Sequence, residues 1–483
     1  MWEGRLEKIT GHKFRIPKDY KPGMRVDGVI YADEKLLTSI KKDRAPEQVA
    51  NVAFLPGIVG SSLAMPDIHW GYGFPIGGVA ATDPEAGGVI SPGGVGYDIN
   101  CGVRMVKTSL VLSDIKTKIN EIVNVLYNNI PSGVGSKGKV RLSRHEEKRL
   151  LLGGAKWAVS QGFGVKEDLE FCEESGAIEG ADPDAVSERA YERGKSQAGT
   201  LGSGNHFVEV QVIEDIFDRD AAEIFGIDIN QIMVMIHTGS RGFGYQVCDD
   251  SLRQMGKCLL KYKINVPDRQ LACAPVNSPE GRDYIGAMRA AANYAWSNRQ
   301  ILMHLARESF EKIFGQGWHS LGMDLIYDVA HNVAKFEKYM VEGKMKTLCV
   351  HRKGATRAFG PGNPQLPKRY QSIGQPVLIP GDMGRASYLL VGTKQAEEES
   401  FASTCHGAGR IMSRHQAMHS VSFDNLMREL KQKGIEVRAT GKKTLVEEAP
   451  LAYKDVNQVV DVVQKAGLSK KVARLRPLCV VKG

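Results

Sequence analysis

Three short apolar segments that each lead into a histidine constrain the fold of this chain more than any other feature. They are Met233–Ile236 before His237, Leu325–Ala330 before His331, and Leu348–Val350 before His351. An apolar run of this length, followed by polar residues, is typical of a buried strand that ends at the rim of a sheet. Rigid strand ends commonly carry binding and catalytic side chains. One such histidine is more often structural, but three together favour a functional site.

Helical and strand-like patterns are mixed along the chain without regular alternation. Amphipathic helical spacing is found at Ser113–Asn129, Arg144–Gln161, Val247–Tyr262, Asp283–Phe314, Phe423–Gly434 and Val456–Gly467. Short strands are predicted at Val103–Thr108, Ile232–Ile236, Leu325–Ala330, Thr347–Val350 and Pro376–Ile379. We therefore predict an α/β fold of mixed α+β character, in which mixed sheets are flanked by helices.

Composition excludes several classes of protein. Of the 483 residues, 42% are apolar and 25% are charged, which excludes disorder as the main state. Eight Cys are too few for a disulfide scaffold. No apolar run reaches the roughly 18 residues of a membrane span, and the first residues lack a secretion signal, so we predict a cytoplasmic protein without membrane association. The net charge of +9 fits a polyanionic partner and fits ordinary charge scatter equally well.

Glycine is over-represented and clusters beside polar residues. The chain has 53 Gly in 483 residues, above the roughly 7% of an average protein. One Gly-rich stretch, Gly133–Val140, resembles both a dinucleotide-binding loop and a P-loop. It follows no buried strand, and Val140 stands where a P-loop needs Ser or Thr. A phosphate-binding loop and a plain flexible loop remain equal alternatives for this stretch.

Several metal-ligating residues stand next to glycines or at strand ends. They are Asp98, Cys101, His206, His237, His331 and His406. Ligands from distant segments are typical of catalytic metal sites, whereas structural zinc sites use clustered Cys pairs, which this sequence lacks. One Asp, one Cys and three His are too many for an open site with one metal, and they suit two metals bridged by a thiolate. Cys indicates a soft metal such as Zn and Asp suits Mn or Mg, so the residues leave the metal open.

His406 is followed by Gly407-Ala408-Gly409, whose backbone N–H groups can surround an anion beside the imidazole. This arrangement suits a histidine that attacks a phosphate. A further metal ligand is an equal alternative for His406 on residue type alone.

Five longer motifs then occur in order along the chain. They are Met65–Phe74, Gly94–Gly102, Leu201–His206, His237–Gly242 and Cys405–Gly409. With these motifs, essentially the whole chain resembles the RtcB family of RNA ligases, the tRNA-splicing ligases that use GTP. The resemblance implies a single large catalytic domain over residues 1–483, whose metal and guanylate site is assembled from residues 98 to 482.

The resemblance also implies GTP and two Mn²⁺ ions as cofactors. Cys101 would bridge the ions, with Asp98 and His206 on one and His237 and His331 on the other. His406 would be the nucleophile and form a GMP–histidine phosphoramidate. The guanylate would pass to an RNA 3′-phosphate, and the 5′-hydroxyl of a second RNA would release GMP; a 2′,3′-cyclic phosphate would first be opened. The implied partners are RNA, as tRNA halves or other cleaved RNA, and the activating protein archease.

Guanylate contacts are expected where the motifs match. They are Asn205, His206, Phe207, Glu209, His331, Asn332, Pro380, Gly381, Asp382, Met383, Ser387, His406, Gly407, Ala408, Gly409, Tyr453 and Lys482. Asp382 departs from the family pattern, which has Ser or Thr at this position. A carboxylate would repel the triphosphate unless it were turned away or paired.

The basic residues nearest the motifs are Arg241, Arg352, Lys353 and Arg357, and we predict that they contact RNA phosphates. Asp67 and His69 are predicted to support the metal ligands through hydrogen bonds. Two other functions remain open. A binuclear metal phosphatase or phosphodiesterase would use the same ligands without a nucleotide step, and a non-catalytic RNA-binding subunit would not need them.

Overall fold

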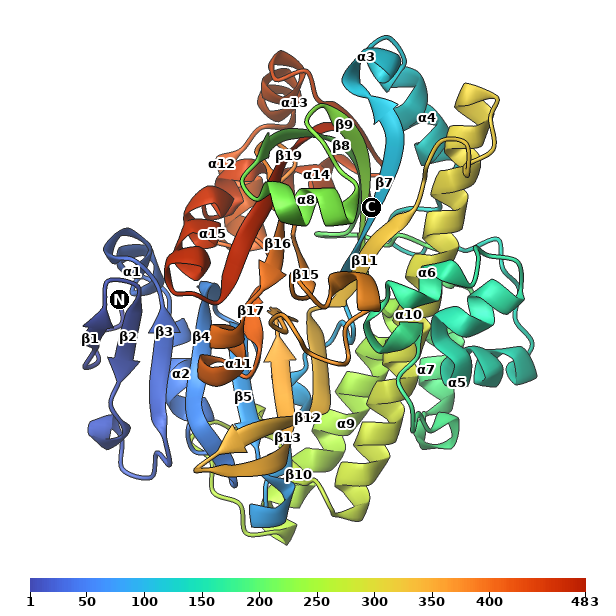
Figure 1. Cartoon of the computed structure of the whole chain (residues 1–483). Coiled ribbons are helices and arrows are strands. Elements are labelled where there is room, and N and C mark those ends of the chain that lie inside the picture. The colour runs from blue at the N-terminus through green and yellow to red at the C-terminus, as the bar shows by residue number, and fades with distance from the viewer.

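Two large β-sheets organise the chain in the computed structural model, which describes residues 1–483 (Figure 1). The first sheet has seven strands in the order β1-β2-β3-β4-β5-β13-β12, and only β3 and β4 pair in parallel. These strands are β1 (Glu7–Thr10), β2 (Lys13–Ile16), β3 (Asp27–Tyr31), β4 (Ile58–His69), β5 (Ile76–Thr82), β13 (Lys344–Lys353) and β12 (Asn332–Val341). The sheet thus joins the N-terminal residues to the middle of the chain.

The second sheet has eight strands and contains the C-terminal strand in its interior. In order they are β11 (Leu325–Ala330), β7 (Gly102–Val111), β9 (Gln231–Thr238), β8 (Phe207–Ile216), β19 (Ser469–Lys482), β16 (Ser387–Gly392) and β15 (Pro376–Ile379), with β18 (Glu436–Ala439) beside β19. Two short pairs complete the strands: β6 (Val89–Ile90) with β10 (Ala274–Pro275), and β14 (Ala355–Arg357) with β17 (Ser403–Cys405). Because β19 pairs with both β8 and β16, the last residues of the chain are part of the core.

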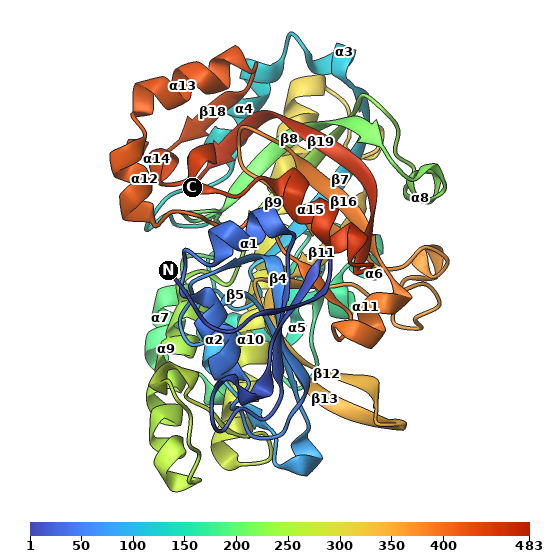
Figure 2. The ribbon, with the colours of Figure 1, turned by 90° about the vertical axis from the view of Figure 1, so that its left-hand side faces the viewer.

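Helices cover both sheets. They are α1 (Glu34–Ile40), α2 (Ala45–Val52), α3 (Leu112–Ile115), α4 (Ile119–Asn129), α5 (Arg144–Ser160), α6 (Glu167–Glu170), α7 (Glu188–Gly194), α8 (Arg219–Phe225), α9 (Arg241–Lys261), α10 (Pro279–Phe314), α11 (Lys394–Glu399), α12 (Arg414–Ser420), α13 (Phe423–Gln432), α14 (Lys442–Glu447) and α15 (Val456–Lys465). Helices α5, α7, α9 and α10 gather on one side, and α12, α13 and α14 lie near the C-terminal strand (Figure 2). None of the helices has both the length and the apolar character needed to span a lipid bilayer.

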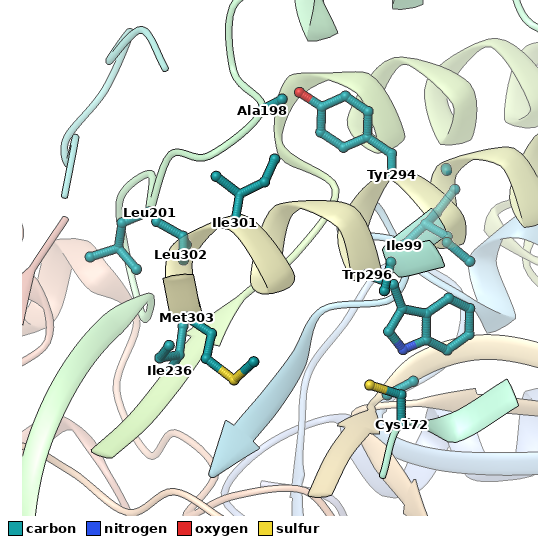
Figure 3. Close-up of a cluster of buried hydrophobic side chains, with 14 of the residues drawn as sticks. Ile99, Cys172, Ala198, Leu201, Ile236, Tyr294, Trp296, Ile301, Leu302 and Met303 are labelled. Carbon is teal, nitrogen blue, oxygen red and sulfur yellow. The ribbon is translucent and has the colours of Figure 1, made fainter. Parts of the chain in front are cut away.

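Helix α10 is the centre of the largest apolar cluster. Its side chains Trp296, Ile301, Leu302 and Met303 are buried and belong to one cluster with Ile236 of β9 (Figure 3). Burial of each large apolar side chain contributes about 1.5–3 kcal/mol. This packing fixes the helix against the strands whose ends carry the predicted histidines. All eight cysteines are buried and none forms a disulfide.

The predicted mixed α/β fold is confirmed, and most predicted elements are present. Three helices differ from their predictions, and one of them is α10, which begins at Pro279 and not at the predicted Asp283. The pattern over 113–129 is divided into α3 and α4 by a turn at residues 116–118. Helix α9 begins at Arg241, six residues before the predicted start, because Gly242 and Gly244 weaken the helical signal in its first turns. Those glycines are needed there: a Cβ on Gly244 would come 1.9 Å from the Ser240 hydroxyl.

Candidate active site

The predicted histidines meet where four neighbouring strands begin or end. His237 near the end of β9 pairs with Val103 of β7 and with Phe207, the first residue of β8. His331 follows the last residue of β11, which pairs with Gly102 of β7. Asp98 and Cys101 lie just before β7 and His206 just before β8, so this register places all five predicted metal ligands at one rim of the eight-stranded sheet.

Asp98, Cys101 and His206 form a compact cluster whose ligand atoms all lie within 4.8 Å of one another. The Cys101 Sγ lies 3.5 Å from His206 Nε2 and 3.2 Å from His237 Nε2. The His206 Nε2 lies 2.8 Å from Asp98 Oδ2. The thiol therefore stands between two imidazoles, as a sulfur that bridges two cations would.

A line of imidazoles continues from this cluster. Successive ring centroids are separated by 5.5 Å from His206 to His237, by 5.7 Å to His331 and by 5.3 Å to His406. The Nδ1 of His331 is held by Thr356 Oγ1 at 2.9 Å, and His331 Nε2 is buried without a hydrogen-bond partner. Buried polar atoms are nearly always paired, so this nitrogen fits a metal ligand held in orientation from behind.

Burial also sets the protonation of the cluster. It lowers the pKa of His206, His237 and His331, which favours the neutral imidazole that binds metals. Burial by itself raises the pKa of Asp98, but His206 and Arg241 more than offset it and leave the pKa at about 2. Burial and the Asp98 charge raise the pKa of the Cys101 thiol. A bound cation would reverse that last effect and hold the thiolate.

His406 follows β17 and is held by Asp67 of β4. The Asp67 Oδ2 lies 2.6 Å from His406 Nδ1 and accepts the backbone N–H groups of His406 and Gly407 at 2.9 and 3.2 Å. The His406 side chain is 17% exposed while Asp67 is fully buried. A neutral imidazole whose Nδ1 proton is donated to this carboxylate has its lone pair on Nε2, the atom that a nucleophile needs.

A cavity of about 380 Å³ extends from the histidine cluster to the C-terminal strand. Apart from His206, every predicted metal and guanylate residue lines this cavity. They are Asp98, Cys101, Asn205, Phe207, Glu209, His237, His331, Asn332, Pro380, Gly381, Asp382, Met383, Ser387, His406, Gly407, Ala408, Gly409, Tyr453 and Lys482. Residues from at least six separate segments therefore converge on one pocket, as the motifs predicted.

The far end of the cavity is polar and buried. Burial raises the pKa of Glu209 to about 7, and Gln211 donates a hydrogen bond to that carboxylate. Burial lowers the pKa of Lys482, whose Nζ lies 5.4 Å from the ring centre of Phe207. The penultimate lysine is thus fixed in β19 inside the pocket, where its three N–H donors and the Glu209 acceptor can face a nucleobase edge.

Asp382 is paired with Arg385. This pairing reduces the predicted repulsion between the Asp382 carboxylate and a triphosphate. The Asp382 Oδ1 accepts the backbone N–H of Gly384 at 3.0 Å, and Oδ2 lies 3.4 Å from the Arg385 guanidinium. Burial raises the pKa of Asp382, because the charged carboxylate is disfavoured away from water. The carboxyl is therefore compatible with a neighbouring phosphate.

Two of the predicted roles are corrected by the structure. Asp67 contacts the candidate nucleophile His406 and no metal-ligating side chain, and the His69 Nδ1 lies 3.0 Å from the Asp67 carbonyl oxygen. Arg352 and Arg357 do not reach a surface where RNA could bind. Each is buried and forms ion pairs with acids: Arg352 with the buried Glu337, and Arg357 with Glu337 and the partly exposed Glu174.

The remaining basic residues lie beside the cavity. Lys353 lines the cavity, but its Nζ donates to the carbonyl oxygens of Tyr72 and Phe74, so it supports a loop. The Arg241 guanidinium lies 3.1 Å from His206 Nδ1, and its phosphate contact stays a prediction. His351, the third strand-end histidine, is structural: its Nε2 accepts the Ser91 N–H and its Nδ1 faces the Ala80 carbonyl.

Sequence reasoning missed several lining residues. The residues that line the cavity but were not predicted to do so are His69, Tyr72, Ile76, Gly96, Tyr97, Lys353, Gly354, Arg410, Arg414, Glu448 and Val480. Of these, His69 and Lys353 were predicted in other roles. Arg410 follows directly after the Cys405–Gly409 motif, and that position was a usable signal. No sequence signal pointed to Glu448, because only the fold shows that it contacts Arg410 and Tyr453 at the pocket.

Known proteins are similar to this chain over nearly its whole length. A family model described as tRNA-splicing ligase RtcB matches residues 48–483. The tRNA-splicing ligase RtcB of Archaeoglobus fulgidus is 56% identical over 481 residues, which cover 100% of this chain and 99% of the relative. The proteins of the same name from Methanococcus maripaludis and Thermococcus kodakarensis are 53% and 52% identical over 478 residues, each covering 99% of both chains.

Proposed function

The chain belongs to the RtcB family of tRNA-splicing ligases, and we propose that it joins RNA ends through guanylylation of His406 with GTP and two Mn²⁺ ions. As a family member it is an RNA ligase that acts in tRNA splicing, and RNA is its substrate. The nucleotide, the metals and the residue roles are the proposed part. Archease as an activating partner and a cytoplasmic location also remain predictions.

The observation that supports guanylylation is the orientation of His406 by Asp67 at the edge of a nucleotide-sized cavity. The Nε2 lone pair would attack the α-phosphorus of GTP, so that an N–P bond forms while the P–O bond to pyrophosphate breaks and its electron pair leaves with pyrophosphate. Positive charge develops on the imidazole during this step. The Asp67 carboxylate stabilises that charge through the Nδ1 hydrogen bond.

The cluster beside His406 fits a pair of divalent cations. Cys101 would bridge them, Asp98 and His206 would hold one, and His237 and His331 the other. Manganese accepts this mixture of carboxylate, imidazole and thiolate ligands. Bound there, the cations would supply charge neutralisation for the reacting phosphates. The unpaired and buried Nε2 of His331 is the local feature that agrees with this ligand set.

The cavity would orient the nucleotide. Glu209 would accept N–H groups of the guanine edge and Lys482 would donate to its carbonyl oxygen, while the Phe207 and Tyr453 side chains line the same pocket. The backbone N–H groups of Ala408 and Gly409 would face the phosphates, while that of Gly407 donates to Asp67. Adenine offers the opposite donor and acceptor pattern to this pair, so the pocket favours guanine.

Two transfers to RNA would follow. An oxygen of the RNA 3′-phosphate attacks the guanylate phosphorus, which breaks the N–P bond and returns His406 to its neutral form. The 5′-hydroxyl of the second RNA end then attacks the activated 3′-phosphate, and GMP leaves. A 2′,3′-cyclic phosphate end requires prior opening by water.

The alternative of a binuclear phosphatase or phosphodiesterase is not favoured. The family match covers residues 48–483 and relatives of more than half identity carry the ligase name. A phosphatase would also leave the buried acceptor Glu209 and the buried Lys482 at the far end of the cavity without a role.

One experiment tests the proposal. The protein is incubated with α-³²P-labelled GTP and Mn²⁺, and the protein-bound label is tested for acid lability and alkali stability, as expected of a histidine phosphoramidate. We expect label on the wild type and none on His406→Ala. Label that persists in His406→Ala, or a wild type that hydrolyses phosphates without becoming labelled, would contradict the proposed mechanism.

A further inference from the structure

Exposed aromatic side chains border the catalytic cavity on the segment that follows β4. Trp70 is 46% exposed and Tyr72 is 36% exposed, and Tyr72 lines the cavity. Trp70 stacks on no other ring of the protein, whereas Tyr72 contacts Tyr97 edge to face at 5.8 Å between ring centres. Exposed rings beside a site that processes nucleic acid are typical of platforms on which nucleobases stack.

The loop that carries these rings is rigid. The Gln48 side chain donates to the Gly71 carbonyl at 2.6 Å and accepts the Gly71 N–H at 3.0 Å. The buried Lys353 donates to the carbonyl oxygens of Tyr72 and Phe74. Burial of a lysine without a carboxylate is costly, and it lowers the pKa of Lys353 to about 7. The fold therefore keeps Trp70 and Tyr72 exposed even though burial of Lys353 lowers the stability of the protein. This is expected of a preorganised binding surface.

Two exposed basic residues flank the acid that holds the Trp70 backbone. The backbone N–H of Trp70 donates to Asp43 Oδ2 at 2.7 Å, and Asp43 lies in the turn between α1 and α2. Its neighbours Lys42 and Arg44 are exposed, and neither forms an ion pair with a protein carboxylate. Helices α1 and α2 lie beside β4 in the first sheet (Figure 2). Exposed rings and unpaired cations on neighbouring segments are the usual elements of a surface for single-stranded nucleic acid.

We propose that Trp70, Tyr72, Lys42 and Arg44 bind the single-stranded RNA that carries the 3′-phosphate end. The proposal rests on the function proposed above. The choice of strand follows from position: Trp70 and Tyr72 continue the segment that holds Asp67, and Asp67 contacts His406, from which the 3′-phosphate must collect the guanylate. Arg241 lies on the opposite side of the histidine line, next to His206, and is available to the other strand.

The test isolates the step that involves only the 3′-phosphate strand. Guanylylated protein is mixed with a single-stranded RNA that ends in a 3′-phosphate, without a 5′-hydroxyl partner, and formation of the activated 3′ end is followed against RNA concentration. We expect Trp70→Ala and Tyr72→Ala each to raise the half-saturating RNA concentration roughly 5- to 100-fold, the range of one lost stacking contact. Trp70→Phe and Tyr72→Phe should recover most of the loss.

The charges are tested by salt dependence. In the double variant Lys42→Gln, Arg44→Gln, the slope of log affinity against log salt concentration should fall by about 0.7 for each lost phosphate contact. Phe217→Ala is the matched control, since Phe217 is an exposed ring, 50% accessible, that lies away from the cavity. It should leave the RNA dependence unchanged.

Three results would overturn the proposal. The first is an unchanged half-saturating RNA concentration in Trp70→Ala and Tyr72→Ala. The second is an equal increase of that concentration in Phe217→Ala. The third is a Trp70 or Tyr72 variant that weakens only the binding of the 5′-hydroxyl strand, measured when pre-activated RNA is sealed. Failure of the wild type to acquire label from GTP would instead contradict the proposed function. The two failures are therefore distinguishable within one set of assays.

Discussion

At the scale of single residues, the proposed chemistry depends on which ring nitrogen of His406 carries the proton. In Asp67→Asn the amide oxygen would still accept the backbone N–H groups of His406 and Gly407, but the carboxylate charge that favours the proton on Nδ1 would be lost. We expect the rate of GMP transfer to His406 to fall roughly 100-fold, with little change in GTP affinity. Single-turnover labelling at saturating GTP measures this rate. Equal labelling rates in the variant and the wild type would show that Asp67 does not set the tautomer.

Glu209 gives the site a pH dependence of its own. Burial raises the pKa of this carboxyl to about 7, above the usual value near 4.5. The carboxylate that accepts guanine N–H groups is therefore scarce below neutral pH, and its fraction increases as pH rises through 7. We expect KM for GTP to fall between about pH 6 and about pH 8 in the wild type and to stay flat in Glu209→Gln. The same slope in both proteins would argue against a contact between Glu209 and guanine.

Residue types could be predicted better than their partners. The glycine-flanked motifs placed Asp98, Cys101 and His406 in one site, and the structure brings them together. The sequence did not show that Arg352 and Arg357 face Glu337 and Glu174, because a buried arginine and an RNA-binding arginine have the same local signal. Only the three-dimensional arrangement distinguishes them.

At the scale of elements, a buried ion cluster joins β7, β11 and α10 behind the metal ligands. Asp328 accepts hydrogen bonds from Arg104 Nε at 2.8 Å, from Arg299 at 2.8 and 2.9 Å, and from Trp296 at 3.1 Å. Arg299 also donates to the carbonyl and side-chain oxygens of Asn100, which has a φ of 51° next to Cys101. The cluster thus holds Asn100 in a left-handed backbone conformation, which orients the thiol of the neighbouring Cys101.

Asp328→Ala should therefore be strongly destabilising. It would leave Arg104 and Arg299 buried without a counter-charge, which costs about 3–5 kcal/mol. Chemical denaturation should show a lower midpoint, and the variant should lose Mn²⁺ affinity because Asn100 is released. Asp114→Ala, at an exposed helix start, is a suitable control and should change stability by about 1 kcal/mol. A midpoint that shifts no more than the control would contradict the role of the cluster.

Element positions could be predicted from amphipathic spacing in α5 and from continuous apolar runs in β11 and β15, whose residues are all buried. The start of α9 could not, since its first turns contain Gly242 and Gly244 and lie under Asp98, whose Oδ1 accepts the Ser240 N–H at 3.1 Å. Local helix propensity does not predict this helix start, because the residues in the first turns suit the contacts of the site and not helix formation. The sheet order was also beyond prediction, because pairing between β13 and β5 joins segments more than 250 residues apart in sequence.

At the scale of the whole molecule, the proposed metal ligands come from segments between residues 98 and 331 and lie at the centre of the fold. Metal binding should therefore stabilise the entire chain, because the native state holds the assembled ligands and the unfolded chain does not. At a free Mn²⁺ concentration of about 100 times Kd, the gain is about 2.7 kcal/mol. We expect the thermal unfolding temperature to rise with Mn²⁺ and to return after chelation.

Two matched variants distinguish a proposed metal ligand from a nearby histidine that is not a ligand. His331→Ala removes a proposed ligand and should reduce the Mn²⁺-dependent shift, whereas His351→Ala removes a buried histidine that faces Ser91 and Ala80. His351→Ala should lower the unfolding temperature in the absence of metal and keep the full shift with it. The difference arises because the cation adds stability only through ligands that the fold has brought to one rim. A wild type whose unfolding temperature is the same with Mn²⁺ and with chelator would rule out a metal centre at this rim.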